Sequence, residues 1–140
     1  MKNYLSKISG PLLDRIDIHV EVPAIEYREL RSGIEGESSA SIREQIVAAR
    51  GIQAGRFKGF KVNCNGRMST RHLKRFCRLE AEGESILELA MQELALSARA
   101  HHKIIRVART IADLDGAEQI TASHLSEAVQ YRNLDRQMWF

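Results

Sequence analysis

The chain has 140 residues, of which 44% are hydrophobic and 28% are charged. This length is that of one ordinary domain, and this balance of apolar and charged residues excludes wholesale disorder. No apolar run approaches the ~20 residues of a membrane-spanning helix, so no membrane partner is expected. The net charge of +3 is too small to indicate a nucleic-acid-binding protein by itself.

Residues 17–22 carry the only pattern that predicts a β-strand. Three apolar residues alternate there with polar ones, namely Ile18, Val20 and Val22. Pro23 ends this run. No second convincing strand follows, and a lone strand can neither satisfy its backbone groups nor bury its apolar face. We therefore expect the segment to be part of something larger. Residues 24–40 are rich in turn formers and are expected to be a connector.

From residue 41 onward the spacing of apolar residues predicts a bundle of four or five helices. Ser41 and Glu44 have the S-x-x-E spacing of a capping box, which predicts that the first helix starts there. That helix would carry an apolar stripe formed by Ile42, Ile46, Val47 and Ala49.

The second half of the chain accounts for the other helices. Four further helices are expected. One begins at Ser69 or Thr70, one spans residues 84–96, one spans residues 97–114, and the last begins after Thr121. Gly116 is the expected stop of the helix over residues 97–114. The core of the bundle is expected to include Ile104, Ile105, Ala108, Ile111 and Ala112 from that helix.

One block of the chain is basic throughout. Between Gln45 and Leu79 there is no Asp or Glu, but there are nine basic residues: Arg50, Arg56, Lys58, Lys61, Arg67, Arg71, Lys74, Arg75 and Arg78. Several Lys and Arg side chains together neutralise phosphates, and Phe57 and Phe60 interleave with them. The candidate DNA contacts are Arg56, Lys58, Lys61, Arg71, Lys74 and Arg75. A solvated, charged face of the bundle is the alternative.

The chain contains no complete set of catalytic motifs. It has neither a G-x-x-x-x-G-K-[ST] phosphate loop nor a G-x-G-x-x-G motif. His101 and His102 are adjacent and point about 100° apart on a helix, so they cannot bind one metal ion together. Cys64 and Cys77 suit neither a disulfide framework nor a zinc site, which indicates a reducing cytoplasm, and Cys77 is expected to be a buried, inert thiol. We expect no metal site, and no enzymatic activity from this polypeptide alone.

Several blocks of sequence resemble one family of ATPases. Residues 10–17, Gly-Pro-Leu-Leu-Asp-Arg-Ile-Asp, resemble the L-L-D-R block of AAA+ ATPases in the magnesium chelatase and MCM branch. Similarity to magnesium-chelatase-like ATPases of the competence protein ComM type extends over residues 36–43, 48–50, 96–100, 107–114, 120–121 and 127–132. The matches follow the same order as in the family and cover nearly the whole chain.

This resemblance implies a fold and a domain order. The fold class is mainly α: a helical bundle, the AAA+ C-terminal lid, with a short N-terminal remnant of the α/β ATPase core. Residues 1–23 would be the edge of that core, residues 24–40 the connector, and residues 41–140 the helical lid. The phosphate loop and the metal-binding acidic motif would lie in a preceding part of a longer protein. Without that core, the N-terminal segment is expected to be disordered, folded onto the lid, or paired with another copy.

The resemblance also implies two functional arginines. Arg15 matches the family's arginine finger, which reaches the nucleotide of a neighbouring subunit in a ring, and Arg99 matches the sensor-two arginine of the lid. A planar, permanently charged guanidinium can hold phosphate oxygens and neutralise charge on the transferred phosphoryl group. Asp14 would fix the conformation around Arg15. ATP and Mg²⁺ would be bound by the full-length protein, and neither would be bound tightly by this chain.

Two functions from different classes follow from these observations. The first is the lid of an AAA+ ATPase that forms an oligomeric ring, with a hexamer expected. This ATPase would process DNA in competence and recombination rather than insert magnesium into porphyrin. The full-length protein would hydrolyse ATP, and this chain alone would not. The alternative is a stand-alone helical DNA-binding or adaptor module that uses the basic block of residues 45–79. The expected partners are neighbouring subunits of a homo-oligomeric ring, and DNA.

Overall fold

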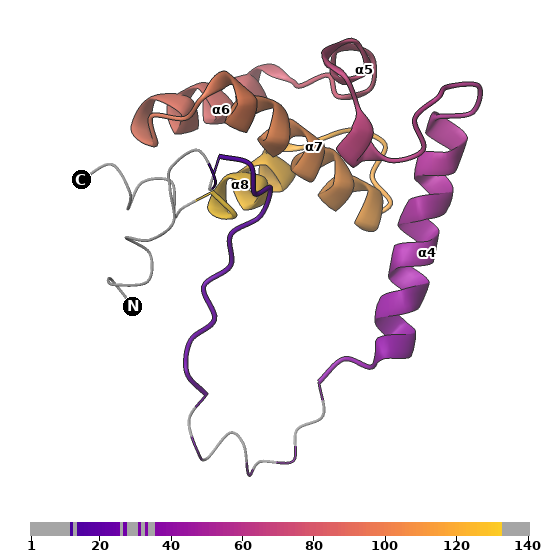
Figure 1. Cartoon of the computed structure of the whole chain (residues 1–140), viewed down its shortest axis with the longest axis vertical. Helices are drawn as coiled ribbons and strands as arrows, with labels where there is room; N and C mark the ends of the chain where they lie inside the picture. Colours follow the sequence, from indigo (N-terminus) through magenta and orange to yellow (C-terminus); the bar gives the residue numbers. More distant parts are fainter. Residues whose placement is uncertain are drawn as a thin grey trace.

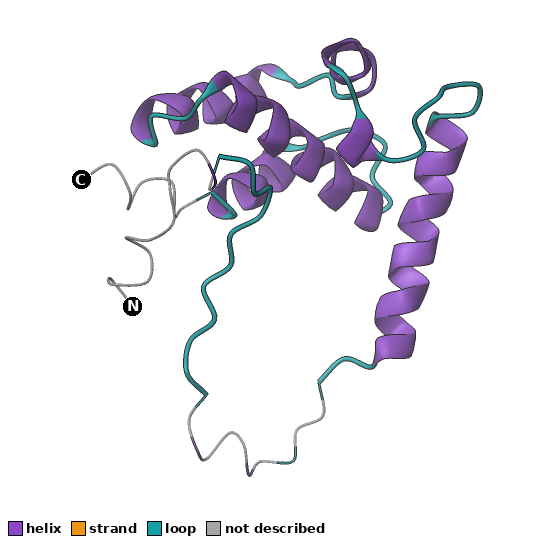
Figure 2. Ribbon diagram, viewed as in Figure 1, coloured by secondary structure: helices purple, strands orange, loops and turns teal. Residues whose placement is uncertain are grey.

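All regular structure in the described part of the chain is helical (Figure 1; Figure 2). The computed structural model describes residues 36–132 and, before them, residues 12, 14–25, 27, 31 and 33. Within these residues there is no strand, so the prediction of a mainly α bundle is confirmed. The elements are α4 (Ser39–Arg56), the 3-10 turn η1 (Asn65–Arg67), α5 (Thr70–Phe76), α6 (Ala81–Glu93), α7 (Ala98–Leu114) and α8 (Ala122–Gln130).

The helix α7 lies at the centre of the bundle. It packs against α4, α5, α8 and η1, while α6 packs against α8. Apolar residues that recur at the helical period form one stripe along α7, and this stripe faces the core. All five predicted core residues are buried, namely Ile104, Ile105, Ala108, Ile111 and Ala112. The prediction of the core from this helix is therefore confirmed.

Both ends of α7 are defined by local hydrogen bonds. The hydroxyl of Ser97 accepts a hydrogen bond from the backbone N–H of Ala100 at 3.1 Å, which makes Ser97 the N-cap. At the other end Gly116 has a φ of +66°, in the left-handed region that glycine adopts without strain. The backbone N–H of Ala117 then donates to the Ala112 carbonyl at 2.8 Å. The predicted stop at Gly116 is confirmed.

The helices α5 and α8 begin where the sequence predicts, and histidines complete both caps. Ser69 is the N-cap of α5 and Thr121 is the N-cap of α8. In each cap the histidine three residues later accepts a hydrogen bond from the N-cap backbone N–H, at 3.1 Å for His72 and 3.0 Å for His124. Histidine takes the place that Glu or Gln usually has in a capping box.

The helix predicted over residues 84–96 begins and ends earlier, as α6. Its end is set by Ala95, which has a φ of +47°. The backbone N–H of Leu96 donates to the Met91 carbonyl at 3.1 Å across this left-handed residue. An αL residue after a helix closes it in this way, usually with glycine in that position.

The predicted start of α4 is wrong by three residues. The N-cap is Ser38, whose hydroxyl accepts a hydrogen bond from the backbone N–H of Ser41 at 3.2 Å. The hydroxyl of Ser41 instead donates to the carboxylate of Glu37 at 2.6 Å, so Ser41 and Glu44 form no capping box. Most of the predicted apolar stripe is also exposed, because the N-terminal half of α4 projects from the bundle (Figure 1). Ala49 is buried, but Ile42, Ile46 and Val47 are exposed.

The predicted strand over residues 17–22 is wrong. This stretch has no regular secondary structure, and its apolar residues Ile18, Val20 and Val22 are exposed. No second strand exists in the described part of the chain to pair with it, which is the physical reason that it does not form a ladder. The beginning of the segment lies against the bundle instead, since the backbone N–H of His19 donates to the Tyr131 carbonyl at 2.8 Å. Of the three expected outcomes, folding onto the helices is observed for residues 17–19 of this stretch.

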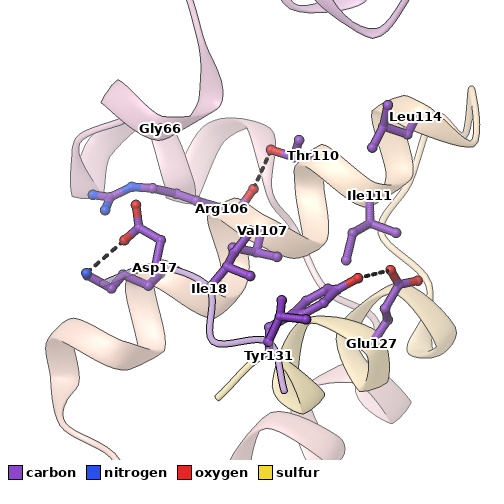
Figure 3. Close-up of a pocket in the computed structure, with 12 residues that line it drawn as sticks. Asp17, Ile18, Gly66, Arg106, Val107, Thr110, Ile111, Leu114, Glu127 and Tyr131 are labelled. Atoms are coloured by element: carbon purple, nitrogen blue, oxygen red, sulfur yellow. Dashed lines mark hydrogen bonds and ion pairs between the residues drawn. The ribbon is translucent and has the colours of Figure 1, made fainter. Parts of the chain in front are cut away.

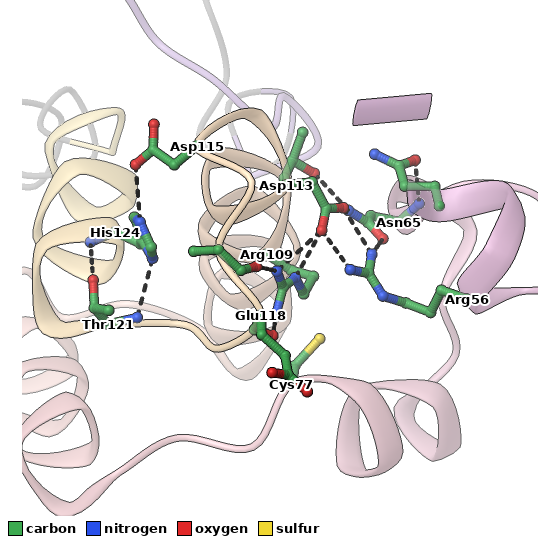
Figure 4. A network of polar contacts seen from close by, with 12 residues as sticks. Arg56, Asn65, Cys77, Arg109, Asp113, Asp115, Glu118, Thr121 and His124 are labelled. Atoms are coloured by element: carbon green, nitrogen blue, oxygen red, sulfur yellow. Dashed lines mark hydrogen bonds and ion pairs between the residues drawn. The ribbon is translucent and has the colours of Figure 1, made fainter. Parts of the chain in front are cut away.

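A buried carboxylate joins α4, η1 and α7 (Figure 4). The side chain of Asp113 is fully buried and accepts hydrogen bonds from Arg56 at 2.7 Å, from Asn65 at 2.7 Å and from Arg109 at 3.1 Å. Arg109 also donates to the carbonyls of Ala117 and Glu118, at 2.6 and 2.8 Å. One carboxylate thus pairs with two guanidinium groups, and one of these, that of Arg109, also binds the loop after α7.

The charge of Asp113 is maintained by these partners. Burial by itself raises the pKa of this carboxyl group, but the hydrogen bonds from Arg56 and Asn65 and the positive charges of Arg56 and Arg109 outweigh burial. The pKa of Asp113 therefore lies below its ordinary value, and the group is ionised in the folded chain at neutral pH.

We expect Asp113→Asn to lower the free energy of unfolding by about 3–5 kcal/mol, because the buried guanidinium of Arg109 and the largely buried one of Arg56 lose their counter-charge. Urea unfolding followed by circular dichroism measures this change. Asp115→Asn is the matched control, since Asp115 pairs with His124 at 3.0 Å but its carboxylate is largely exposed. The control should lose about 1 kcal/mol or less. Equal losses in the two variants would contradict the role of Asp113.

The pH dependence of the same variant gives a second readout. Because the pKa of Asp113 is lowered by folding, its carboxylate stabilises the fold above the unfolded-state value of about 3.9. This contribution is lost as the pH falls through the folded-state pKa. The difference in stability between the parent chain and Asp113→Asn should therefore shrink below about pH 4.

Candidate functional site

The carboxylate of Asp14 connects the segment that carries Arg15 to the start of α7. It accepts a hydrogen bond from the Ser97 hydroxyl at 2.8 Å and from the Arg99 guanidinium at 3.0 Å. Arg15 follows directly in the chain, has an exposed side chain, and is held in a turn by a hydrogen bond from its backbone N–H to the Leu12 carbonyl at 3.0 Å. The structure thus brings the segments of the two predicted arginines together, although 83 residues separate Asp14 from Ser97.

Ser97 has two roles in this contact. As the N-cap of α7 its oxygen accepts from the Ala100 N–H, while its hydroxyl hydrogen is donated to Asp14. Burial alone raises the pKa of Asp14, but the hydrogen bonds from Ser97 and Arg99 and the charges of Arg99 and Arg132 outweigh it. The pKa of Asp14 therefore lies below its ordinary value, so Asp14 is a carboxylate at neutral pH.

A second ion pair lies one helical turn further along α7. The ammonium group of Lys103 is 2.8 Å from the carboxylate of Asp17, and the Lys103 side chain is 8% exposed while that of Asp17 is 64% exposed. Two hydrogen bonds to backbone carbonyls follow. The Arg132 guanidinium donates to the Ile16 carbonyl, and the His19 backbone N–H donates to the Tyr131 carbonyl. We call residues 14–19 the docked segment, because these contacts hold it along α7 and the end of α8.

A groove of about 430 Å³ lies beside the docked segment (Figure 3). Apolar side chains of α7 form one wall, and Ile18 of the docked segment and Tyr131 contribute to the rim (Figure 3). The hydroxyl of Tyr131 donates to Glu127 at 3.1 Å, and this hydrogen bond raises the pKa of Tyr131. The groove is thus largely apolar, with the Asp17–Lys103 pair at its edge.

Sequence reasoning missed Ser97, Lys103 and Asp17 as members of this site. A signal for them exists, because Arg99 and Lys103 are four residues apart on α7 and Asp14 and Asp17 are three residues apart before it. Residues four apart on a helix share a face, so two cations aligned on α7 can meet two carboxylates of one short segment. The sequence does not show which carboxylates Arg99 and Lys103 contact, because Asp14 and Asp17 are more than 80 residues away in the chain.

Most basic side chains of the block are exposed, and one of them lies over aromatic rings. The guanidinium of Arg75 lies 5.2 Å from the ring centroid of Phe60 and 5.3 Å from that of Phe76, which are cation–π distances. Phe60 is partly exposed, whereas Phe57 is buried in the core. We call the following exposed residues the aromatic–basic surface: Lys58, Phe60, Lys61, Arg71, Lys74 and Arg75.

Arg56 does not belong to this surface, although the sequence suggested it as a DNA contact. Its side chain is 12% exposed, and its guanidinium is bound to Asp113 and to the side chain of Asn65 at 2.9 Å. The counter-charge that makes Arg56 structural lies 57 residues further along the chain, outside the basic block. The placement of Arg56 among the DNA contacts is corrected accordingly.

The other chemistry-bearing groups fit structural roles. Burial raises the pKa of the Cys77 thiol to about 11, as expected for an inert cysteine. Burial and the neighbouring His102 lower the pKa of His101. The described residues contain no cluster of three or more His, Cys, Asp or Glu side chains suited to a metal ion. They also include no helix that is long and apolar enough to cross a membrane.

Comparison with known proteins identifies two family models along the chain. Residues 36–132 match the C-terminal region of magnesium chelatase, subunit ChlI, and residues 1–30 match magnesium chelatase, subunit ChlI. Competence protein ComM of Haemophilus influenzae is 42% identical over 134 residues, which are 95% of this chain. The uncharacterized protein YifB of Escherichia coli is 40% identical over the same length, and an uncharacterized protein of Mycobacterium tuberculosis is 30% identical over 131 residues. The chain spans 26% of the length of each of these relatives.

We expect Asp14→Asn to loosen the start of the docked segment, because the amide cannot pair with the Arg99 charge, while the contacts of Asp17, Ile16 and His19 remain. The heteronuclear ¹⁵N NOE of residues 14 and 15 should fall, while the NOE of α7 stays unchanged. Glu21→Gln is the control, since Glu21 is exposed and follows the docked segment. An unchanged NOE in Asp14→Asn would show that the Asp14 contact does not hold the segment.

Proposed function

Because the chain belongs to the magnesium chelatase ChlI family, we propose that it is the C-terminal lid region of a ring-forming AAA+ ATPase. In this proposal the chain supplies Arg15 as an arginine finger to a neighbouring subunit and Arg99 as the sensor-two residue. The ring is a homo-oligomer, with six subunits as the expected number. The observation that carries the proposal is the contact of Asp14 with Ser97 and Arg99, because it joins the segment of Arg15 to the start of α7.

The chemistry of both positions suits a guanidinium group. Arg15 is exposed and can reach a nucleotide outside its own chain. Arg99 has a side chain that is 63% exposed, so its remaining N–H groups can meet phosphate oxygens. An arginine that approaches the transferred phosphoryl group stabilises the transition-state charge without taking part in covalent chemistry.

ATP and Mg²⁺ belong to the longer protein in this proposal. The cations Arg15 and Arg99 fit the phosphate end of ATP, whereas the phosphate loop and the acidic metal ligands would come from a core that precedes this chain. Bound Mg²⁺-ATP would supply the reactive phosphoryl group. The residues of this chain would hold and neutralise its oxygens.

The relative from Haemophilus influenzae is named as a competence protein. We extend this to the present chain and propose that the ATPase acts on DNA in the cytoplasm, in competence and recombination. The aromatic–basic surface supports the extension, because its basic side chains are exposed and one of them, Arg75, lies over the exposed ring of Phe60.

Arg15→Ala in the longer protein should reduce kcat for ATP hydrolysis by roughly 10³-fold or more, which is the effect of removing an arginine finger. Nucleotide affinity and the unfolding midpoint should remain at the parent values, because Arg15 is exposed. Steady-state ATPase assays measure kcat, and nucleotide titration measures the affinity.

Arg43→Ala is the matched control for this experiment, since Arg43 is an exposed arginine of α4. Its turnover should equal that of the parent protein. Full turnover in Arg15→Ala would refute the finger role, and loss of folding in that variant would make Arg15 structural.

Direct DNA binding by this chain is a second candidate function, favoured by the aromatic–basic surface. Proteins bind single-stranded DNA without sequence preference when aromatic rings stack on its bases and Lys and Arg side chains neutralise its phosphates. In this candidate Phe60 stacks on a base while Lys58, Lys61, Arg71, Lys74 and Arg75 lie along the phosphates.

If this surface binds DNA, the affinity for a labelled oligothymidine should fall steeply with salt. Replacing both Lys61 and Arg71 by Ala should reduce the slope of log K against log salt by about 1.4, at ~0.7 for each phosphate contact. Fluorescence anisotropy at several salt concentrations measures the slope, with Arg43→Ala as the control. Binding that does not depend on salt would exclude this function.

A further inference from the structure

The two histidines that complete the caps of α5 and α8 can do so only in one protonation state. The backbone N–H of Ser69 donates to Nδ1 of His72 at 3.1 Å, and the backbone N–H of Thr121 donates to Nδ1 of His124 at 3.0 Å. A backbone N–H is always a donor, so Nδ1 must accept and carries no proton. Each of these capping boxes therefore requires a neutral imidazole ring.

This requirement separates the two caps from an ordinary capping box. Glu or Gln in the same position offers an oxygen that accepts throughout the neutral pH range. Histidine is the side chain that ordinarily changes its charge between pH 5 and 8. A proton on Nδ1 makes this atom a donor, which then faces the donor N–H of the N-cap residue. Acid therefore replaces a hydrogen bond at the helix start by a contact between two donors.

The ring of His72 lies among aromatic rings that already hold one cation. Its centroid is 5.5 Å from that of Phe60, 6.3 Å from that of Phe57 and 6.4 Å from that of Phe76. The guanidinium of Arg75 lies over the rings of Phe60 and Phe76. A second positive charge at His72 would be close to this guanidinium, and like charges disfavour protonation.

The other charged groups around His72 do not compensate for a proton on its ring. Three basic residues lie on the elements next to it, namely Lys58 and Lys61 of the loop after α4 and Arg71 of α5. On α7, Arg106 binds the Met68 carbonyl, directly before the cap. Within the described residues no carboxylate forms an ion pair with His72.

The opposite face of α5 has titratable groups of its own. It borders a hollow that is lined by Lys74 of α5, by Glu84 of α6 and by His101 and His102 of α7. His72 does not line this hollow, because it lies on the other side of the helix. These groups therefore face away from the cap contact of His72.

The second histidine, His124, has a carboxylate partner that His72 lacks. Its Nε2 is 3.0 Å from the Asp115 carboxylate, while its Nδ1 serves the cap (Figure 4). Asp115 would stabilise a positive charge on the ring, and this offsets the loss of the cap contact. Three more carboxylates lie on the elements around α8 and are exposed, namely Glu118 after α7, Glu127 of α8, and Glu84 of α6.

We propose that the start of α5 is a pH-sensitive switch, in which protonation of His72 opens the capping box and loosens the aromatic–basic surface. Arg71 lies in the first turn of α5, and Phe60 packs against the ring of His72, so both lose their fixed positions when the cap opens. The start of α8 stays closed over the same pH range, because Asp115 holds the charged ring of His124. This inference does not depend on the proposed ATPase and DNA-binding functions.

The response has one direction. The neutral ring is the form that holds the cap, so the cap contact is fully present above the titration range of histidine and is lost as the pH falls through it. Removal of a helix cap raises the open fraction of the first turn by roughly fivefold. Because α5 has only seven residues, its first turn is a large part of the helix.

Amide hydrogen exchange of the chain at pH 7.5 and pH 5.5 tests the proposal. The backbone N–H groups of Leu73 and Leu125 are matched reporters, since each donates to the carbonyl of its own N-cap residue, at 3.0 and 3.2 Å. Protection factors remove the chemical pH dependence of exchange. We expect protection of Leu73 to fall roughly fivefold at pH 5.5 and that of Leu125 to stay nearly constant. Constant protection of Leu73, or an equal loss at both amides, would overturn the proposal.

Two variants of His72 separate the cap from other effects of acid. In His72→Gln the side-chain oxygen accepts from the N-cap N–H and does not titrate, so Leu73 should be equally protected at both pH values. In His72→Ala no acceptor remains, so protection should be low at both pH values. A pH response of Leu73 that persists in His72→Gln would contradict the assignment to this ring.

A change at the other cap should transfer the response to α8. Asp115→Asn removes the carboxylate that stabilises a charged His124, so protection of Leu125 should now fall at pH 5.5 by about the same factor as that of Leu73 in the parent chain. His124→Gln in the same background should abolish this fall. If Leu125 keeps full protection in Asp115→Asn, a histidine cap without a carboxylate partner does not open in acid, and the proposal is wrong.

Discussion

The arrangement of the bundle depends on one buried carboxylate, Asp113. Its two oxygens receive hydrogen bonds from Arg56, Asn65 and Arg109, which come from the end of α4, from η1 and from α7 itself. Because each of these groups would be costly to bury alone, the three elements fit together only with all partners present. This constraint holds α7 rigidly in the bundle, and α7 in turn presents its other end to the docked segment.

The N-terminal end of α7 is paired differently. In each of its two ion pairs one partner is largely exposed, Arg99 at 63% and Asp17 at 64%, whereas Asp14 is 26% and Lys103 8% exposed. Asp14 and Asp17 approach Arg99 and Lys103 from a segment without regular structure. The partly exposed Asp14–Arg99 pair is expected to stabilise the fold less than the buried Asp113 contacts do. One helix thus has a buried polar network near its C-terminus and partly exposed ion pairs near its N-terminus.

Features that depend on neighbouring residues were predictable from the sequence. The core stripe of α7, the stop at Gly116 and the caps at Ser69 and Thr121 all arise from contacts within a few residues. The start of α4 was not predictable from the S-x-x-E spacing, because Glu37 offers the Ser41 hydroxyl a competing acceptor. The strand over residues 17–22 has the right pattern but lacks a partner, and pattern alone does not report whether a partner exists.

The features of the site that could not be predicted from the sequence depend on contacts between residues that are distant in the chain. Arg56 was grouped with surface cations because its counter-ion Asp113 is 57 residues away. Family resemblance suggested roles for Arg15 and Arg99 and placed Asp14 beside Arg15, and the structure adds the contact of Asp14 with Ser97 and Arg99. No local spacing could show that contact, since Arg99 is 85 residues from Asp14.

The central claim is that Asp14 positions the segment of Arg15 for catalysis, and a double-mutant cycle of ATPase rates in the longer protein tests it most directly. The cycle compares Asp14→Asn, Arg15→Ala and the double variant with the parent protein. If Asp14 acts through Arg15, Asp14→Asn should reduce kcat in the parent background and have no further effect once Arg15 is alanine. Additive effects of the two substitutions would contradict the account.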